Sequence, residues 1–397
     1  MRLKKNEEKR IIQGHLWIYS NEVDTERTPF KEFSAGQLID IEDSKGRWLG
    51  RGYVNPQTLL CVRVLTRNPQ EPIDTAFFVK RIQAALRLRE ELFSKPYYRL
   101  IYGESDYLPG LIVDRYGDLL VVQITTAGME ALREFVINAL CSVISPSSIL
   151  LRNDHAMRLV EGLPQYVSAA FGEPPQRCLL EENDASFWMA PWSGQKTGWF
   201  YDHRENRRQL QRFVRGKRVL DVFSYVGAWA VQAAVYGARE VWAVDSSAPA
   251  LERCVENAQL NQVNGVLTTF QNDAFDQLRE FVDDRIKFDV VILDPPAFIK
   301  KRKDFSQGFL AYKRLNNLAL RLLSNNGFLV TASCSHHLSA DDLQRAVLLS
   351  SVDTQSELQL FIRGHQGLDH PIHPAIPETD YLKALFYRLT SSSTISI

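Results

Sequence analysis

The chain has 397 residues, of which 45% are hydrophobic and 24% are charged. These values are ordinary for a globular protein and exclude a disordered or fibrous chain, and the length suggests two or three domains. The 47 basic and 47 acidic side chains give a formal net charge of zero. Any affinity for nucleic acid or for an anionic membrane must therefore come from local clusters of charge.

The cysteine spacing and the N-terminal sequence bear on metals, disulfides and membranes. Five cysteines stand at wide spacing without a C-x-x-C pair, which argues against a disulfide framework or a zinc site. We expect no bound metal. The N-terminal MRLKKNEEKR lacks the apolar segment of a signal peptide, and no run of 18 uncharged apolar residues occurs. We therefore expect a cytoplasmic protein that makes no membrane contact.

Three patterns follow one another along the chain and predict three domains. Residues 1–72 read as short strands broken by turns, which is typical of a small β-barrel. Residues 73–185 mix helical and strand patterns and predict an α+β domain. Residues 186–397 form the third domain, in which strands alternate with helices from about residue 218. This alternation predicts an α/β fold with a parallel, doubly wound, Rossmann-like sheet that helices cover on both faces.

The strand ends of the third domain are the places to search for a site, because ligands of open α/β sheets bind outside the carboxyl ends of the strands. We expect strands over 218–223, 240–245, 266–271, 288–294, 327–334, 358–364 and 382–389, and helices over 227–236, 248–261, 308–323 and 339–351.

Acidic residues lie at the ends of the first three of these strands: Asp221, Asp245 and Asp273. An acid in the position of Asp245 can accept two hydrogen bonds from a ribose diol, and Asp273 could meet the exocyclic amine of an adenine. A single acid at a strand end is common and carries little information. Three in succession predict a nucleoside-binding site.

The loop after the first strand argues against a dinucleotide. It contains one glycine, Gly227, instead of the G-x-G-x-x-G fingerprint. The bulky Phe223 and Tyr225 would obstruct a pyrophosphate. The loop therefore disfavours a nicotinamide oxidoreductase and favours S-adenosylmethionine as the cofactor.

The fourth strand ends in Asp294-Pro295-Pro296-Ala297-Phe298. The two prolines stiffen the loop, so Asp294 becomes a fixed hydrogen-bonding group, and Phe298 offers a face for stacking. An Asp-Pro-Pro motif after such a strand is typical of methyltransferases that act on a planar nitrogenous base. By itself it fits methylation of an amine as well as of a carbon.

The fifth strand ends at Cys334, and a neighbouring position in the sheet would bring this thiol into one cleft with Asp294. This pairing predicts that Cys334 is a nucleophile. Because C5 of cytosine is too electron-poor to be methylated directly, a thiolate adds first to C6, while Asp294 stabilises N3 and the N4 amine.

Two alternatives remain open. Cysteine is often a buried, inert residue, and an inert Cys334 would leave an N-methyltransferase, for example one acting on guanine N2, that uses Asp294 alone. The other alternative is an RNA-binding protein that keeps the cofactor fold without catalysis.

Two basic clusters predict an RNA surface, although a charge run is usually only a solvated surface. Lys300, Lys301, Arg302 and Lys303 follow the Asp-Pro-Pro loop directly, and with Phe298 they could bind phosphates and a base. The second cluster contains Arg204, Arg207, Arg208, Arg212, Arg215, Lys217 and Arg218.

Together these motifs resemble the large-subunit (23S) ribosomal RNA cytosine-5 methyltransferases that carry an N-terminal PUA domain. The resemblance spans nearly the whole chain and includes HLWIYSNEV (15–23), GESDYLPGLIVDRYGD (103–118), SGQKTGWFYDHRENR (193–207), DVFSYVGAWA (221–230), DPPAF (294–298) and SCS (333–335). His336 and His337 depart from the family pattern, which expects smaller residues there.

The resemblance implies a PUA-like RNA-binding domain over 1–72, large-subunit ribosomal RNA as the partner, and a homodimer. It also implies that Gln195, Thr197, Asp202 and Arg204 line the cofactor and substrate cleft.

Overall fold

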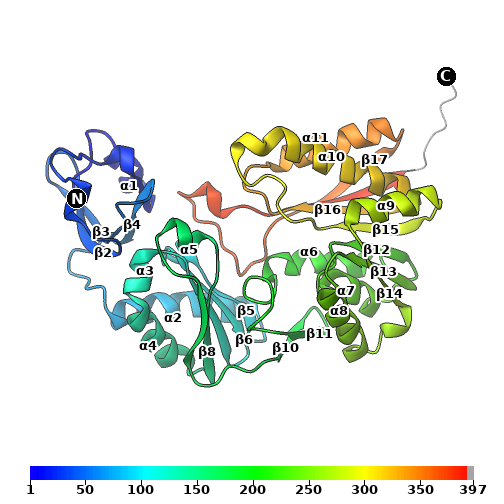
Figure 1. Cartoon of the computed structure of the whole chain (residues 1–397), viewed down its shortest axis with the longest axis horizontal. Helices are drawn as coiled ribbons and strands as arrows, with labels where there is room; N and C mark the ends of the chain where they lie inside the picture. The colour runs from blue at the N-terminus through cyan, green and yellow to red at the C-terminus, as the bar shows by residue number, and fades with distance from the viewer. Residues whose placement is uncertain (391–397) are drawn as a thin grey trace. The chain divides into compact units, whose positions relative to one another are not determined.

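The computed structural model describes residues 1–390 and contains two compact units (Figure 1). Unit 1 consists of Met1–Leu180, Met189–Tyr201 and Leu368–Thr379. Unit 2 consists of Glu181–Trp188, Asp202–Gly367 and Asp380–Ile397, described as far as residue 390.

Unit 1 begins with an antiparallel four-stranded sheet in the order β1-β4-β3-β2. Its elements are α1 (Glu8–Ile12), β1 (Trp17–Tyr19), β2 (Gln37–Glu42), β3 (Trp48–Val54) and β4 (Leu60–Thr66). A Cβ at Gly52 would lie 2.1 Å from the carbonyl oxygen of Arg63, so only glycine permits the close approach of β3 and β4. The short strands predicted for this region are present.

The second part of unit 1 is a mixed five-stranded sheet in the order β5-β6-β7-β8-β9, in which only β7 and β8 run parallel. The carboxylate of Asp74 accepts a hydrogen bond from the backbone of Phe77 and so begins the long helix α2. Helices α2 and α4 pack against each other and bury Phe78, Ile82 and Val136 in one core. The elements are α2 (Thr75–Leu92), β5 (Tyr97–Tyr102), β6 (Leu111–Tyr116), β7 (Leu119–Ile124), α3 (Ala127–Ala131), α4 (Arg133–Ile144), β8 (Ser148–Asn153), α5 (Met157–Val160) and β9 (Tyr166–Phe171).

Unit 2 is built on a seven-stranded sheet in the order β14-β13-β12-β15-β16-β18-β17. A separate two-stranded ribbon, β10 (Cys178–Glu182) and β11 (Ala185–Met189), precedes it. The strands of the large sheet are β12 (Arg218–Val222), β13 (Glu240–Asp245), β14 (Leu267–Gln271), β15 (Phe288–Leu293), β16 (Leu323–Ser333), β17 (Glu357–Gly364) and β18 (Lys383–Thr390).

The prediction of a parallel sheet is wrong at one strand. β18 runs antiparallel to both of its neighbours, β16 and β17. A parallel connection needs a crossover, usually a helix, and the segment between β17 and β18 contains only a short 3₁₀ turn.

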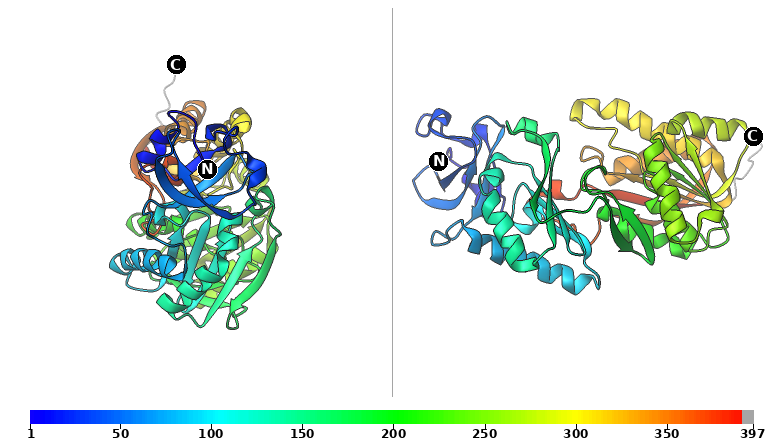
Figure 2. Two further views of the ribbon diagram at one scale, coloured as in Figure 1. Left: turned by 90° about the vertical axis from the view of Figure 1, so that its left-hand side faces the viewer. Right: turned by 60° about the horizontal axis from the view of Figure 1, so that its bottom comes forward.

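Helices cover both faces of the large sheet, as predicted (Figures 1 and 2). One face packs α7 (Ala228–Val235) and α8 (Ala248–Leu260) around a core that includes Trp229 and Cys254. The other face packs α9 (Ala274–Asp283), α10 (Phe305–Leu322) and α11 (Ala340–Asp353) around Phe281, Tyr312 and Leu343. α9 lies outside the predicted helices. The short helix α6 (Arg204–Arg208) precedes the sheet.

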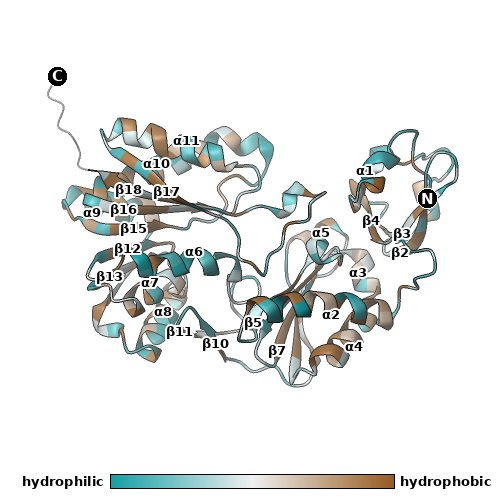
Figure 3. Cartoon of the chain, turned by 180° about the vertical axis from the view of Figure 1, so that it is seen from behind, coloured by the Kyte–Doolittle hydropathy of each residue, from teal (hydrophilic) through white to brown (hydrophobic). Residues whose placement is uncertain are grey.

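The central strands are apolar whereas the helices alternate between polar and apolar residues (Figure 3). In β15, Val290, Val291, Ile292 and Leu293 are all fully buried, as expected for a strand that is covered on both faces. Within residues 1–390, no helix has the length and apolar character needed to cross a membrane.

Candidate active site

The loop between β12 and α7 has an unusual backbone. Phe223 and Tyr225 have positive φ angles of 67° and 50°, and Gly227 has 85°. Such conformations are costly for bulky residues and concentrate at functional sites. A Cβ at Gly227 would lie 2.4 Å from Sγ of Cys254 in α8, so glycine is required where the loop enters α7.

Asp245, at the end of β13, is held in place by backbone groups. Its Oδ2 accepts a hydrogen bond of 2.8 Å from Tyr225 N, and its Oδ1 accepts one of 2.9 Å from Ser247 N. Each carboxylate oxygen has a second lone pair, so the half-buried side chain can still accept hydrogen bonds from a diol.

Asp221, at the end of β12, is completely buried. Its Oδ2 accepts a hydrogen bond of 3.0 Å from Ala230 N, and its Oδ1 has no hydrogen-bond partner within the described part of the chain. Burial, with a further contribution from the negative charge of Asp294, raises the pKa of Asp221 to about 8. The carboxyl group is therefore mostly protonated at neutral pH and can offer a hydrogen-bond donor.

Asp273 has a visible local role. It is the N-cap of α9, and its Oδ1 accepts hydrogen bonds from Phe275 N and Asp276 N at 2.9 and 3.2 Å. The side chain is exposed at the end of β14, and its predicted contact with an adenine stays a prediction.

Asp294 follows β15 and lies against two ring nitrogens. Nε1 of Trp229 donates to Oδ2 at 3.0 Å, and Nε2 of His203 lies 3.2 Å from Oδ1. Burial alone would raise the pKa of Asp294, but the charge and contact of His203 and the hydrogen bond from Trp229 hold it below its ordinary value. Asp294 is thus a fixed, ionised hydrogen-bond acceptor.

Cys334 leaves the sheet beside Asp294. β15 and β16 are parallel neighbours in which Leu293 is paired with Thr331, so the residues that follow both strands reach the same edge of the sheet. The Cys334 side chain is half-buried.

Two hydrogen bonds tie the end of β16 and the turn after it to α10 and to the loop after β15. The hydroxyl of Tyr312 shares a hydrogen bond of 2.8 Å with Oγ of Ser333, and Oγ of Ser335 donates to the carbonyl oxygen of Ile299 at 2.6 Å. Burial raises the pKa of Tyr312 to about 12, and the negative charges of Cys334 and Asp294 add to the increase. Cys334 and Asp294 therefore both act electrostatically on the Tyr312 hydroxyl, which lies between the loops after β15 and β16.

The predicted RNA-binding residues occupy two different environments. Lys300, Lys301, Arg302 and Lys303 are all exposed, directly after the Asp-Pro-Pro loop. The ring of Phe298 is half-buried and packs at 4.8 Å from the ring of Tyr312.

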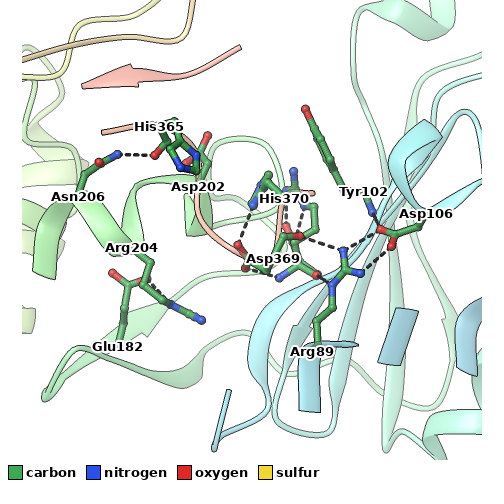
Figure 4. Close-up of polar contacts among 12 residues, drawn as sticks. Arg89, Tyr102, Asp106, Glu182, Asp202, Arg204, Asn206, His365, Asp369 and His370 are labelled. Atoms are coloured by element: carbon green, nitrogen blue, oxygen red, sulfur yellow. Dashed lines mark hydrogen bonds and ion pairs between the residues drawn. The ribbon is translucent and has the colours of Figure 1, made fainter. Parts of the chain in front are cut away.

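The second basic cluster is not one exposed surface. Arg204 and Arg207 are buried, and their guanidinium groups lie 3.5 and 2.6 Å from Glu182 (Figure 4 shows Arg204 and Glu182). These two arginines are bound within unit 2 and are unavailable to phosphates.

The residues implied by the resemblance fall into both units. Gln195 and Thr197 belong to unit 1, where Gln195 is exposed and the Thr197 hydroxyl donates to Asp114 at 2.5 Å. Asp202 and Arg204 belong to unit 2, where Asp202 accepts a hydrogen bond from the Tyr381 hydroxyl. Unit 1 has its own buried polar pairs, such as Arg89 with Asp106 at 2.6 Å (Figure 4).

Four side chains at the site went unnoticed in the sequence: His203, Trp229, Tyr312 and Lys383. His203 and Trp229 lie inside quoted motifs, so their motif membership was a usable signal. Tyr312 and Lys383 lie on α10 and β18 and reach the site only through packing. Among residues 1–390, no three His, Cys, Asp or Glu side chains are grouped so that they could hold a metal ion.

Comparison with known proteins shows similarity over the whole chain. Residues 1–67 match a PUA-like domain family, and residues 160–388 match a family of S-adenosylmethionine-dependent methyltransferases. The ribosomal RNA large subunit methyltransferase I of Tolumonas auensis is 38% identical over 97% of this chain and 98% of its own. The protein of the same name from Escherichia coli K12 is 38% identical over 98% of both chains.

Solved structures share the fold. A S-adenosylmethionine-dependent methyltransferase from Streptococcus mutans has a TM-score of 0.83 and 20% identity over 98% of this chain and 100% of its own. SMU.776, a methyltransferase complexed with SAH, has a TM-score of 0.84 and 20% identity over 98% of this chain and 99% of its own. The predicted fold class and S-adenosylmethionine as the cofactor are confirmed.

Proposed function

The chain belongs to the ribosomal RNA large subunit methyltransferase I family, and on that premise we propose that it methylates C5 of a cytosine in large-subunit ribosomal RNA, with Cys334 as nucleophile. Its methyltransferase domain depends on S-adenosylmethionine. The observation that carries the finer proposal is the placement of Asp294 and Cys334 at the ends of adjacent parallel strands, with the Tyr312 hydroxyl between their loops.

The residues around the β12 loop fit the cofactor. Asp245 can accept hydrogen bonds from the ribose, and the buried Oδ1 of Asp221 lacks a partner within residues 1–390. We assign Asp221, Phe223, Tyr225, Gly227, Asp245 and Asp273 to the cofactor. Gln195, Thr197, Asp202 and Arg204 stay predictions from the resemblance. When bound, S-adenosylmethionine supplies an electrophilic methyl group.

The chain's own residues act on the base. The Cys334 thiolate forms a bond to C6 of the cytosine, and the C5=C6 electron pair is released toward C5. The ionised Asp294 accepts a hydrogen bond from the N4 amine; N3 takes up a proton from solvent as the adduct forms, and the resulting N3–H also donates to Asp294 until that proton is lost again on elimination. After C5 has been methylated, its proton is removed, the C5=C6 double bond reforms, and the C6–S bond breaks to release Cys334.

The exposed basic run positions the RNA. Lys300, Lys301, Arg302 and Lys303 are proposed to bind phosphates next to the target base, and Phe298 is proposed to contact the base. A ribosomal substrate also agrees with the expected cytoplasmic location. The homodimer implied by the resemblance stays a prediction, which sedimentation of the purified chain tests.

A covalent trap tests the proposal. Large-subunit ribosomal RNA carrying 5-fluorocytidine is incubated with the protein and S-adenosylmethionine, because fluorine at C5 cannot leave as a cation and the thioether persists. We expect a protein–RNA complex that survives denaturation and requires the cofactor. Cys334→Ala abolishes both the complex and turnover, whereas the matched Cys141→Ala, which replaces another half-buried cysteine, changes neither.

The competing reaction gives a different result. An N-methyltransferase forms no bond to the base, so it predicts no complex and substantial activity in Cys334→Ala. Full activity of that variant would overturn the cytosine-5 proposal. Nucleoside analysis of the methylated RNA identifies the product as 5-methylcytidine.

A further inference from the structure

Lys383 lies against the turn that carries Cys334. It is the first residue of β18 and is paired in register with Ser333 of β16. Its Nζ donates hydrogen bonds of 2.6 Å to the carbonyl oxygen of Ser335 and 2.8 Å to that of Tyr381. The ammonium group is therefore hydrogen-bonded to the backbone of Ser335, which directly follows Cys334.

The charge of Lys383 is not neutralised by a close carboxylate. Among residues 1–390, no carboxylate forms an ion pair with its Nζ. The ionisable groups that act on it are Cys334 at the end of β16, Asp380 just before β18, and Asp342 on α11. The backbone carbonyls of Ser335 and Tyr381 hold the half-buried Lys383 ammonium group. Its positive charge interacts with the thiol of Cys334.

A nucleophilic cysteine needs a source of positive charge, because the thiolate is the reactive form. His336 and His337 are the nearest candidates in the sequence, but both are exposed, and the ring of His336 packs at 5.4 Å from the ring of Tyr381. Lys383 is held in place by two hydrogen bonds and interacts electrostatically with Cys334.

We propose that Lys383 is a positioning residue that fixes the 333–335 turn and stabilises the thiolate of Cys334. The catalytic meaning of this inference rests on the proposed function, in which Cys334 is the nucleophile. Burial, despite opposition from Cys334, Asp380 and Asp342, lowers the pKa of Lys383 to about 8. The lysine thus remains mostly charged at neutral pH and loses its charge in mildly alkaline solution.

The test measures the thiol itself. The full chain, without RNA, is alkylated with iodoacetamide across pH 6 to 10, and the Cys334 peptide is quantified by mass spectrometry. Lys383→Met keeps the length of the side chain but removes its charge. Lys383→Arg restores the charge, and Lys287→Met removes an exposed lysine that also donates to a carbonyl oxygen, that of Arg321.

We expect Lys383→Met to shift the midpoint of the pH–rate profile upward by about one unit and to slow alkylation at pH 7 about tenfold. At alkaline pH the rates of wild type and variant should converge. The alkylation rate of Lys383→Arg at pH 7 should lie within about threefold of the wild-type rate. The alkylation rate of Lys287→Met should equal that of wild type.

Three results would overturn the inference: an unchanged profile in Lys383→Met, a uniform change at every pH, which indicates altered access, or a wild-type midpoint at or above the ordinary ~8.5 of a cysteine. The midpoint of the wild-type profile is measured without any variant, so it can still refute the inference if Lys383→Met fails to fold.

Failure of the proposed function gives a separate signal. If Cys334→Ala keeps full activity, the covalent mechanism is wrong, whether or not Lys383 shifts the thiol profile. If the 5-fluorocytidine complex forms but Lys383→Met leaves the alkylation profile unchanged, the mechanism stands and the role of Lys383 is wrong.

Discussion

Nε2 of His203 lies 3.2 Å from Oδ1 of Asp294. On the other side of the imidazole, Nδ1 faces the side-chain amide nitrogen of Asn206 at 3.2 Å. The imidazole of His203 is therefore held between Asn206 and Asp294. With the indole of Trp229 on its other oxygen, Asp294 is locked in one orientation.

Trp229→Phe tests whether this orientation matters for methylation. The variant keeps the aromatic ring and loses the N–H that donates to Asp294. A hydrogen bond to a charged group contributes roughly 1.5–3 kcal/mol, so we expect the rate constant for methylation to fall by at least about tenfold. The acid limb of the pH–rate profile should move to higher pH, because Asp294 loses a group that lowers its pKa.

Cofactor affinity, measured by calorimetry, should change by less than about twofold in Trp229→Phe. Trp242→Phe is the matched control, since the indole of Trp242 donates to Glu240 at the far end of the sheet. Equal rates for wild type and Trp229→Phe would show that Asp294 needs no such support.

Asp245→Ala should weaken S-adenosylmethionine binding more than tenfold. On the proposed assignment the substitution removes charge-assisted hydrogen bonds to the ribose, each contributing roughly 1.5–3 kcal/mol. It also releases Tyr225 N and Ser247 N. Calorimetry gives the dissociation constant, with the exposed Asp284→Ala as control. An unchanged constant in a folded Asp245→Ala would refute the assignment of this strand end to the cofactor.

The strand ends of unit 2 could be predicted because the alternation of strands and helices fixes which ends share an edge. Asp221, Asp245, Asp294 and Cys334 all follow from that rule. The helix α9 could also have been predicted from the sequence, because Asp273 caps it and its apolar positions have helical spacing. The predicted helices nevertheless did not include it.

Other features depend on packing that no local pattern encodes. The reversal of β18 brings Lys383 to Cys334, and α10 brings Tyr312 to Ser333. Likewise, the sequence places Arg207 in a basic cluster, whereas the fold buries it against Glu182. Such partners come from distant segments, and a single sequence does not show which of them meet.

The triple variant Lys300→Ala, Lys301→Ala, Lys303→Ala should lose part of the salt dependence of RNA binding. If the three lysines contact phosphates of a single strand, the slope of log K against log salt flattens by about 2, at ~0.7 per contact. Fluorescence anisotropy between low and moderate salt measures this slope. Cofactor affinity should stay the same.

The control for that experiment replaces three exposed basic residues elsewhere in unit 2, Arg239, Lys287 and Arg321, by alanine. They lie near the amino ends of β13 and β15 and the end of α10, away from the site. A slope that changes equally in both triple variants would mean that the 300–303 run is an ordinary charged surface.

Asp221 should make the unfolding free energy of the cofactor-free chain depend on pH. Burial raises the pKa of this carboxyl to about 8 in the folded chain, against an ordinary value of 3.8. Between these two values the folded chain keeps a proton that the unfolded chain has released. Stability therefore falls as the pH rises from about 4 to 8, by at most ~1.4 kcal/mol per pH unit from this group.

Asp221→Asn removes that dependence while keeping an acceptor for Ala230 N. Urea unfolding from pH 5 to 8.5 should show the variant gaining stability relative to wild type as the pH rises, with the difference levelling off above about pH 8. The exposed Asp283→Asn should track wild type. A constant difference between Asp221→Asn and wild type across this range would mean that the buried carboxyl is already ionised in the folded chain.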